Sequence, residues 1–143
     1  MALIVNIMKE IIINSLDAKR IRQRISSIKN GRAYSANDME RLVYELNRAK
    51  MVEPAEIPAD IITMHSIVKV KYVNNNKTFT LQLVYPEEAN IKENKVSIFA
   101  PIAMALLGYK KGDVINWWIP GGKVKIKVED ILYQPEAAGE FQL

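Results

Sequence analysis

Two stretches between residues 15 and 50 carry apolar side chains at helical spacing. In the first, these side chains recur three to five residues apart, at Leu16, Ile21, Ile25 and Ile28. In the second they form a longer stripe, at Met39, Leu42, Val43, Leu46 and Ala49. Such stripes are typical of helices that bury one face. We expect two helices of about 15 residues, each about 22 Å long, packed as an antiparallel hairpin.

Polar and small residues mark the expected ends of these helices. Asn14 and Ser15 can cap the first helix, because their side chains accept hydrogen bonds from the unpaired N–H groups of a first turn. Gly31 suits a left-handed helix end, and Ser35 with Asp38 resembles a capping box. The turn of the hairpin is therefore expected at NGRAYSANDMER.

The pattern changes beyond residue 50. Residues 51–60, MVEPAEIPAD, hold two prolines and three acids and are typical of a stiff linker. From Ile61 the apolar positions follow a period of two, which indicates strands. We predict a short helix behind Pro101, at 102–107, and strands at 66–72, 78–85, 96–99, 114–119 and 124–133.

Together these elements predict an α+β protein. Residues 1–52 are expected to form a helical hairpin, or coiled-coil arm, and residues 53–60 a linker. Residues 61–143 are expected to form a domain with a curved antiparallel sheet and one short helix. Because the two apolar helix stripes can cover each other, we expect a monomer.

Composition narrows the possible chemistry. The 143 residues include no cysteine and one histidine, which excludes disulfides and the usual structural zinc sites. We expect no metal and no cofactor. The opening MALIVNIMKEIIIN lacks the basic start and small-residue cleavage site of a signal peptide, and no run is long enough for a membrane span. We therefore expect a cytosolic protein.

A set of motifs resembles a known family. The stretch SIFAPIAMALLGYKKGDVINWWIPGGKVKIKVEDILY has a helix starting at Pro101, an A-x-A-L-L-G helix end, Gly112-Asp113 and a P-G-G turn, as in Gre-family C-terminal domains. IIINSLDAKRI, ITMHS, LVYPEEA and YQPEAAGEF are similar to segments of the Rnk type, the regulators of nucleoside diphosphate kinase. The resemblance runs from about Ile11 to the C-terminus.

This resemblance implies a fold and a partner. The fold would be a short helical arm joined to a domain of FKBP-like topology. The partner would be RNA polymerase, whose secondary channel rim Gre factors occupy while two carboxylates at their arm tip help to hold a magnesium ion. Rnk-type proteins have a shorter arm and would compete for the entrance without stimulating transcript cleavage. The implied docking residues are Ser97, Ala100, Pro101, Ile102, Met104 and Leu106.

The chain departs from the Gre pattern at the arm tip. The tip residues singled out are Arg32, Tyr34, Asp38 and Glu40. Asp38 and Glu40 are two positions apart on a helix and face different directions, so they are not placed to share a metal. Met104 also stands where the Gre pattern has an arginine. We therefore expect no cleavage stimulation and no enzyme activity.

Several single features have a structural interpretation beside a functional one. Between residues 17 and 50 there are nine Lys and Arg and four acids, so the arm is basic and the rest of the chain sums to about −1. This charge favours nonspecific nucleic-acid contact or a solvated helix face.

His65 is expected to form a hydrogen bond where the linker meets the sheet. Of Trp117 and Trp118, one should face the core and the other outward.

Three alternative functions stay open from the residues. An FKBP-like prolyl isomerase would require Phe79, Phe99, Trp117 and Trp118 to converge on one open pocket. A true Gre-type cleavage factor would require a long arm with paired tip acids. Direct control of nucleoside diphosphate kinase is the third, and no residue pattern points to a kinase contact.

Overall fold

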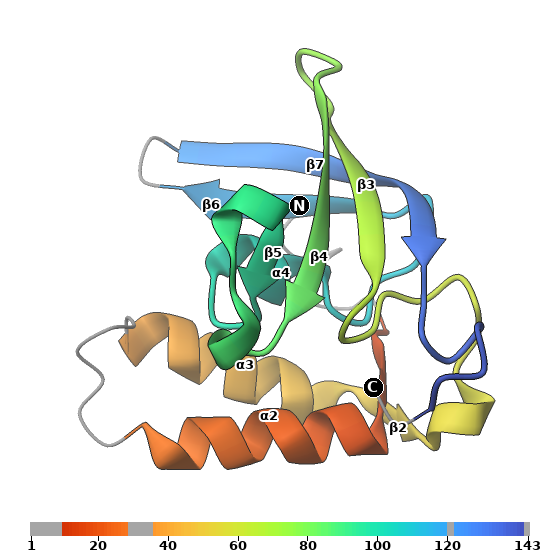
Figure 1. Ribbon diagram of the computed structural model, residues 1–143. Helices are drawn as coiled ribbons and strands as arrows, with labels where there is room; N and C mark the ends of the chain where they lie inside the picture. Colours follow the sequence, from red (N-terminus) through yellow and green to blue (C-terminus); the bar gives the residue numbers. More distant parts are fainter. Residues whose placement is uncertain (1–9, 29–35, 120–121, 142–143) are drawn as a thin grey trace.

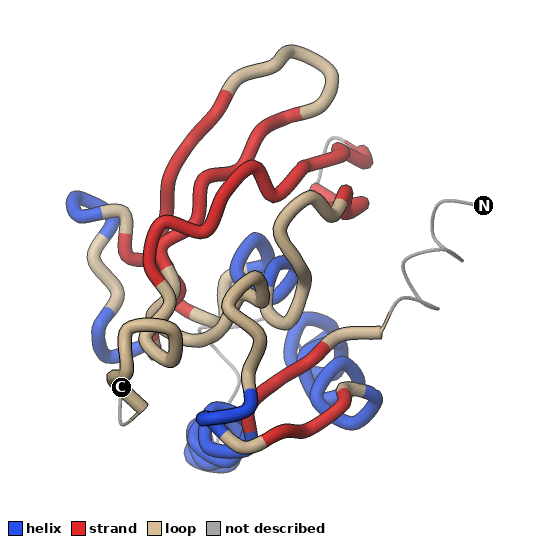
Figure 2. Tube along the Cα trace, turned by 90° about the vertical axis from the view of Figure 1, so that its right-hand side faces the viewer, coloured by secondary structure: helices blue, strands red, loops and turns tan. Residues whose placement is uncertain are grey.

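The computed structural model describes residues 10–28, 36–119 and 122–141. A pair of helices lies at one end of the molecule and a twisted sheet at the other, with a short helix between them (Figure 1). The same order of layers is visible from the side (Figure 2). The α+β class expected from the sequence is therefore confirmed.

The helical pair consists of α2 (Ser15–Ser27) and α3 (Ala36–Arg48). Asn14 caps α2 as predicted, and its side chain accepts a hydrogen bond of 2.6 Å from the backbone N–H of Asp17. Arg22 donates to Asn47 across the pair, at 2.8 Å. The expected helix end at Gly31 and the expected cap at Ser35 lie outside the described residues.

Two short strands connect the N-terminal end of α2 with the C-terminal end of α3. β1 (Ile12–Asn14) runs into α2, β2 (Lys50–Val52) follows α3, and the two pair in parallel. The sequence did not predict them, because three residues are too few to display a period of two. Gly108 lies against β1 with a φ of +85°, and a Cβ at this position would lie 3.0 Å from Ile11 Cβ. A side chain at position 108 would therefore push the helical pair away from the body.

Among the described residues, five strands form the main sheet in the order β5-β4-β3-β7-β6. Their bounds are β3 Ile67–Tyr72, β4 Thr78–Val84, β5 Lys95–Ser97, β6 Val114–Ile119 and β7 Gly122–Tyr133. The short helix α4 (Pro101–Leu106) begins at Pro101, as predicted. The strands closely match the expected ranges, so the alternating pattern located them well.

One part of the sheet prediction is wrong, because the sheet is mixed rather than antiparallel. β5 runs parallel to β4, with Leu83 opposite Val96. The connection 85–94 makes this possible: two 3-10 turns, Pro86–Glu88 and Ile91–Glu93, carry the chain back far enough for β5 to pair with Gln82–Val84, the last three residues of β4. Alternation within a strand does not encode the direction in which the chain returns.

One hydrophobic cluster runs through both ends of the molecule. From the helical end it includes Ile13, Ile21, Leu42 and Leu46, and it continues into α4 and the inner face of the sheet. The predicted linker contains a 3-10 turn, Pro54–Glu56, followed by the buried Ile57. The division into arm, linker and domain stays a prediction, but burial couples the described helices to the body. Trp117 packs against the same core.

Candidate functional site

The docking residues expected from the sequence fall into two groups. Ser97 ends β5, Ala100 caps α4, Pro101 is exposed and Ile102 is half-buried, so these four reach the surface. Met104 is 6% exposed and Leu106 is 0% exposed. Both side chains belong to the core, because α4 packs its inner face under the sheet. A partner would touch the first group, while Met104 and Leu106 would support it from below.

An apolar groove of about 470 Å³ adjoins this surface. It lies along β4 and β5 and ends at α4, and its lining is Phe79, Thr80, Leu81, Ile91, Asn94, Val96 and Ile102. Ile91 is 89% exposed, the largest exposed fraction among the large apolar side chains described. Ile102 belongs both to the groove and to the expected docking residues. The sequence analysis did not single out Ile91, because the parallel return of β5 brings it there.

The tip of the helical hairpin is only partly described. Arg32 and Tyr34 lie outside the described residues. Asp38 is half-buried in the first turn of α3, and Glu40 is exposed two positions later. Within residues 10–28, 36–119 and 122–141, no group of three or more His, Asp or Glu side chains is arranged to hold a metal ion. None of the helices in these ranges is both long and apolar enough to cross a membrane.

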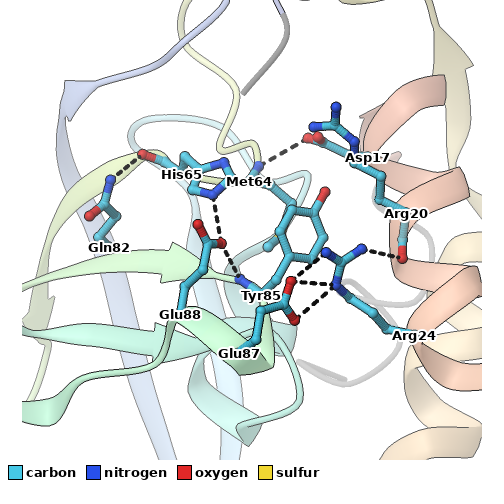
Figure 3. A network of polar contacts seen from close by, with 9 residues as sticks. All are labelled: Asp17, Arg20, Arg24, Met64, His65, Gln82, Tyr85, Glu87 and Glu88. Atoms are coloured by element: carbon cyan, nitrogen blue, oxygen red, sulfur yellow. Dashed lines mark hydrogen bonds and ion pairs between the residues drawn. The ribbon is translucent and has the colours of Figure 1, made fainter. Parts of the chain in front are cut away.

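A buried carboxylate lies where α2 meets the body. Asp17 is 1% exposed and accepts a hydrogen bond of 3.0 Å from the backbone N–H of Met64 (Figure 3). Burial raises the pKa of the Asp17 carboxyl from 3.8 to about 7, although the Met64 N–H favours the charged form. Glu136 raises this pKa further and Arg20 lowers it. Asp17 was not identified from the sequence, since its burial depends on a loop distant in the chain.

Tyr85 forms the second contact of this junction. The guanidinium of Arg24 lies over the Tyr85 ring, 3.8 Å from its centroid, and also pairs with Glu87. That hydrogen-bonded pair raises the pKa of Arg24 and lowers the pKa of Glu87. Burial raises the pKa of the Tyr85 phenol above its usual range. One arginine on α2 is therefore held by both an aromatic face and a carboxylate of the body (Figure 3).

His65 connects the same junction to the sheet. Its Nε2 forms a hydrogen bond of 2.8 Å with Glu88, as its predicted role in fixing the joint requires. Its backbone has a φ of +67°, an uncommon conformation for a residue other than glycine. The backbone carbonyl of His65 accepts from Gln82 at 2.9 Å, and its ring meets Tyr85 edge-on (Figure 3). These contacts hold the loop that presents the Met64 N–H to Asp17.

The C-terminal segment closes the junction from the other side. Glu136 accepts hydrogen bonds from the side chains of Asn14 and Thr63, the latter at 2.7 Å. Gln134 donates to the backbone carbonyls of Pro58 and Ile61, at 2.8 and 2.6 Å. The helix cap, the loop before β3 and the C-terminal segment are thus joined through two side chains.

The four Rnk-like segments identified in the sequence all meet at this junction. IIINSLDAKRI supplies Asn14 and Asp17, ITMHS supplies the Met64 N–H and His65, LVYPEEA supplies Tyr85, and YQPEAAGEF supplies Glu136. The segments are far apart in the chain, but each contributes a polar group that holds the helical pair against the body. These four segments therefore position the helical pair relative to the body.

Comparison with known proteins places the chain in a family. A family profile described as "Transcription elongation factor, GreA/GreB, C-term" matches residues 57–133. The "Regulator of nucleoside diphosphate kinase" of Escherichia coli strain K12 is 39% identical over 135 residues, covering 93% of this chain and 96% of that protein. The "Transcription elongation factor GreA" of Clostridium novyi strain NT is 36% identical over 103 residues, covering 72% of this chain and 65% of that protein.

A solved structure agrees with the sequence matches. The structure described as "Prokaryotic transcription elongation factor GreA/GreB from Nitrosomonas europaea" is 35% identical to this chain, with a TM-score of 0.69. The match covers 87% of this chain and 99% of that one. This chain belongs to the GreA/GreB family, and within it to the regulators of nucleoside diphosphate kinase, which it matches over nearly its whole length.

Proposed function

We propose that this protein is a transcription regulator that binds bacterial RNA polymerase at the rim of the secondary channel, in the cytosol and as a monomer. It would compete with Gre factors for that entrance and would not stimulate transcript cleavage, so it would not be an enzyme. The observation that carries the proposal is the 39% identity to the E. coli regulator of nucleoside diphosphate kinase, which extends over 93% of this chain.

The surface around the start of α4 is the docking site in this proposal. Ser97, Ala100, Pro101 and Ile102 are accessible there, and the groove beside them ends at the exposed Ile91. An apolar side chain that is 89% exposed beside a groove is a reasonable anchor for a protein partner. Met104 and Leu106 would keep α4 in place from the core.

The helical pair supports competition rather than cleavage. Each helix has 13 residues, which corresponds to about 20 Å at 1.5 Å per residue. Leu42 and Leu46 are buried in the shared core, so α3 is packed against the body. Asp38 and Glu40 lie in the first turns of α3 at positions that face apart. A short, body-bound hairpin would occupy the entrance without bringing a carboxylate pair to the catalytic centre.

Competition with a Gre factor on core RNA polymerase tests this proposal. We expect the protein to suppress Gre-stimulated transcript cleavage and to cause no cleavage alone. Ile91→Asp should weaken the suppression at least tenfold, because the charge would enter a protein contact. Leu132→Asp is the matched control, since Leu132 is an exposed apolar side chain on β7. Absence of binding at micromolar protein and low salt would refute the polymerase assignment, and equal loss in both variants would refute the docking surface.

A further inference from the structure

Lysines alternate with apolar residues on two neighbouring strands. On β3, Lys69 and Lys71 flank the buried Val70. On β7 the lysines are Lys123, Lys125 and Lys127, with the buried Ile126 between the last two. Because successive side chains of a strand point to opposite faces, the apolar set forms the inner face and the lysines the outer one.

The pairing of the strands gathers these lysines into one patch. β3 and β7 are antiparallel neighbours, with Lys71 directly opposite Lys127. Like charges in direct cross-strand register destabilise a sheet. Lysines on one strand are about 7 Å apart, and neighbouring strands are about 4.8 Å apart. The two strands lie at the end of the molecule opposite the helical pair (Figures 1 and 2).

The acids on this face are too few to balance the lysines. Glu129 pairs with Lys71 at 3.1 Å, and Asp130 pairs with Lys111 at 3.1 Å. The hydrogen bond from Lys71 lowers the pKa of Glu129, and Lys127 and Lys69 lower it further, so three lysines act on one carboxylate. Counting Lys111 and leaving Lys123 aside, five ammonium groups accompany the carboxylates of Glu129 and Asp130. The charges outside the arm sum to about −1, so the net charge of the body does not reveal this patch.

We propose that the outer face of β3 and β7 binds the phosphodiester backbone of nucleic acid. Lysine is a flexible point charge that neutralises phosphates without reading bases, so the binding would be independent of sequence. Protein interfaces are depleted in lysine, which favours a polyanion over a protein surface as the occupant. The site is distinct from the expected nucleic-acid contact through the helical arm, and it does not depend on the polymerase proposal.

Fluorescence anisotropy over a range of KCl concentrations tests the proposal. The probes are a labelled DNA duplex and a single-stranded RNA of the same sequence, which separate the two sources of phosphate. The triple variant K69Q/K125Q/K127Q removes three lysines from the patch. The matched control K77Q/K92Q/K110Q removes three exposed lysines that lie outside both the patch and the arm, and gives the same net charge.

We expect the patch variant to lose at least tenfold in affinity at low salt and the control to change by less than twofold. The slope of log K against log salt should flatten by about 0.9 per lysine removed for the duplex and about 0.7 for the single strand. Failure of the unmodified protein to bind either probe at low salt would overturn the proposal. So would equal losses in the two variants, which would indicate net charge alone, or no loss in the patch variant, which would assign the binding to the arm. Loss of polymerase binding without any nucleic-acid binding would assign the patch to a protein partner instead.

Discussion

The junction at α2 and the lysine face of the sheet both use charged residues, but they use them in opposite ways. At the junction, Asp17 is buried and receives a backbone N–H, while Arg24 has both an aromatic ring and a carboxylate as partners. On the sheet, Lys69 and Lys125 are exposed, and two lysines stand opposite each other. Paired charges position one part of a protein against another, whereas unbalanced charges remain available to a ligand.

The largest effect should come from the apolar layer beneath the junction. Ile21→Ala should lower the free energy of unfolding by about 2–5 kcal/mol, because Ile21 is fully buried in the core shared by helices and sheet. Val114→Ala, at an exposed position on β6, should change it by less than about 0.5 kcal/mol. Urea denaturation followed by circular dichroism measures both. A similarly small effect of Ile21→Ala would mean that the helices are not held by this core.

The next effect concerns the protonation of Asp17. Its pKa is about 7 in the folded protein and near 3.8 when the chain is unfolded, so the folded state favours the neutral carboxyl. This contribution to stability is fully present below about pH 3.8 and is lost as the pH rises to about 7. Asp17→Asn should remove that part of the pH dependence, which is on the order of a few kcal/mol. The amide keeps an oxygen for the Met64 N–H.

Thermal unfolding between pH 4 and pH 8 measures this effect. The groups that act on the pKa of Asp17 come from α2, the loop before β3, the segment after β4 and the C-terminal segment: Arg20, the Met64 N–H, Tyr85 and Glu136. Asp60→Asn is the control, since Asp60 is exposed. If the Asp17→Asn and unmodified proteins show parallel pH profiles, Asp17 does not titrate in this range.

The sequence predicted the parts of this comparison that depend on local patterning. The helices, the strands and the cap at Asn14 follow from periodicity and capping chemistry, and the hydrogen bond of His65 was anticipated from its place before β3. The burial of Asp17 was missed, because a loop 47 residues away creates it. The lysines of β3 and β7 alternate with apolar residues in the sequence. The lysine face was still missed, because the net charge of all residues outside the arm is close to zero.

The docking prediction was limited for a related reason. The docking residues were chosen by their place in a stretch of sequence that resembles Gre-family domains. That choice grouped the buried Met104 and Leu106 with the accessible Pro101. Only the packing of α4 separates the two kinds. The groove at Ile91 likewise depends on the parallel return of β5, which no local pattern encodes.

A smaller effect is expected at the rim of the junction. Arg24 lies over Tyr85 and pairs with the exposed Glu87. Arg24→Gln should cost about 1 kcal/mol, mainly through the lost contact with the ring, because exposed ion pairs contribute little. A double-mutant cycle with Glu87→Gln measures the ion pair separately. A coupling energy larger than the total effect of Arg24→Gln would mean that the ion pair, rather than the ring, holds this arginine.

The smallest effect on folding should accompany a gain of binding on the lysine face. Glu129→Gln removes a carboxylate that pairs with Lys71. The hydrogen bond from Lys71 is the main cause of the lowered pKa of Glu129. The melting temperature should hardly change, because the substitution leaves the core contacts below the sheet intact. Affinity for duplex DNA at low salt should rise severalfold, since Lys71 becomes available to phosphate. Glu10→Gln makes the same charge change at another exposed position and should leave affinity nearly unchanged. Equal gains in the two variants would mean that net charge, and not the arrangement of lysines on β3 and β7, governs binding.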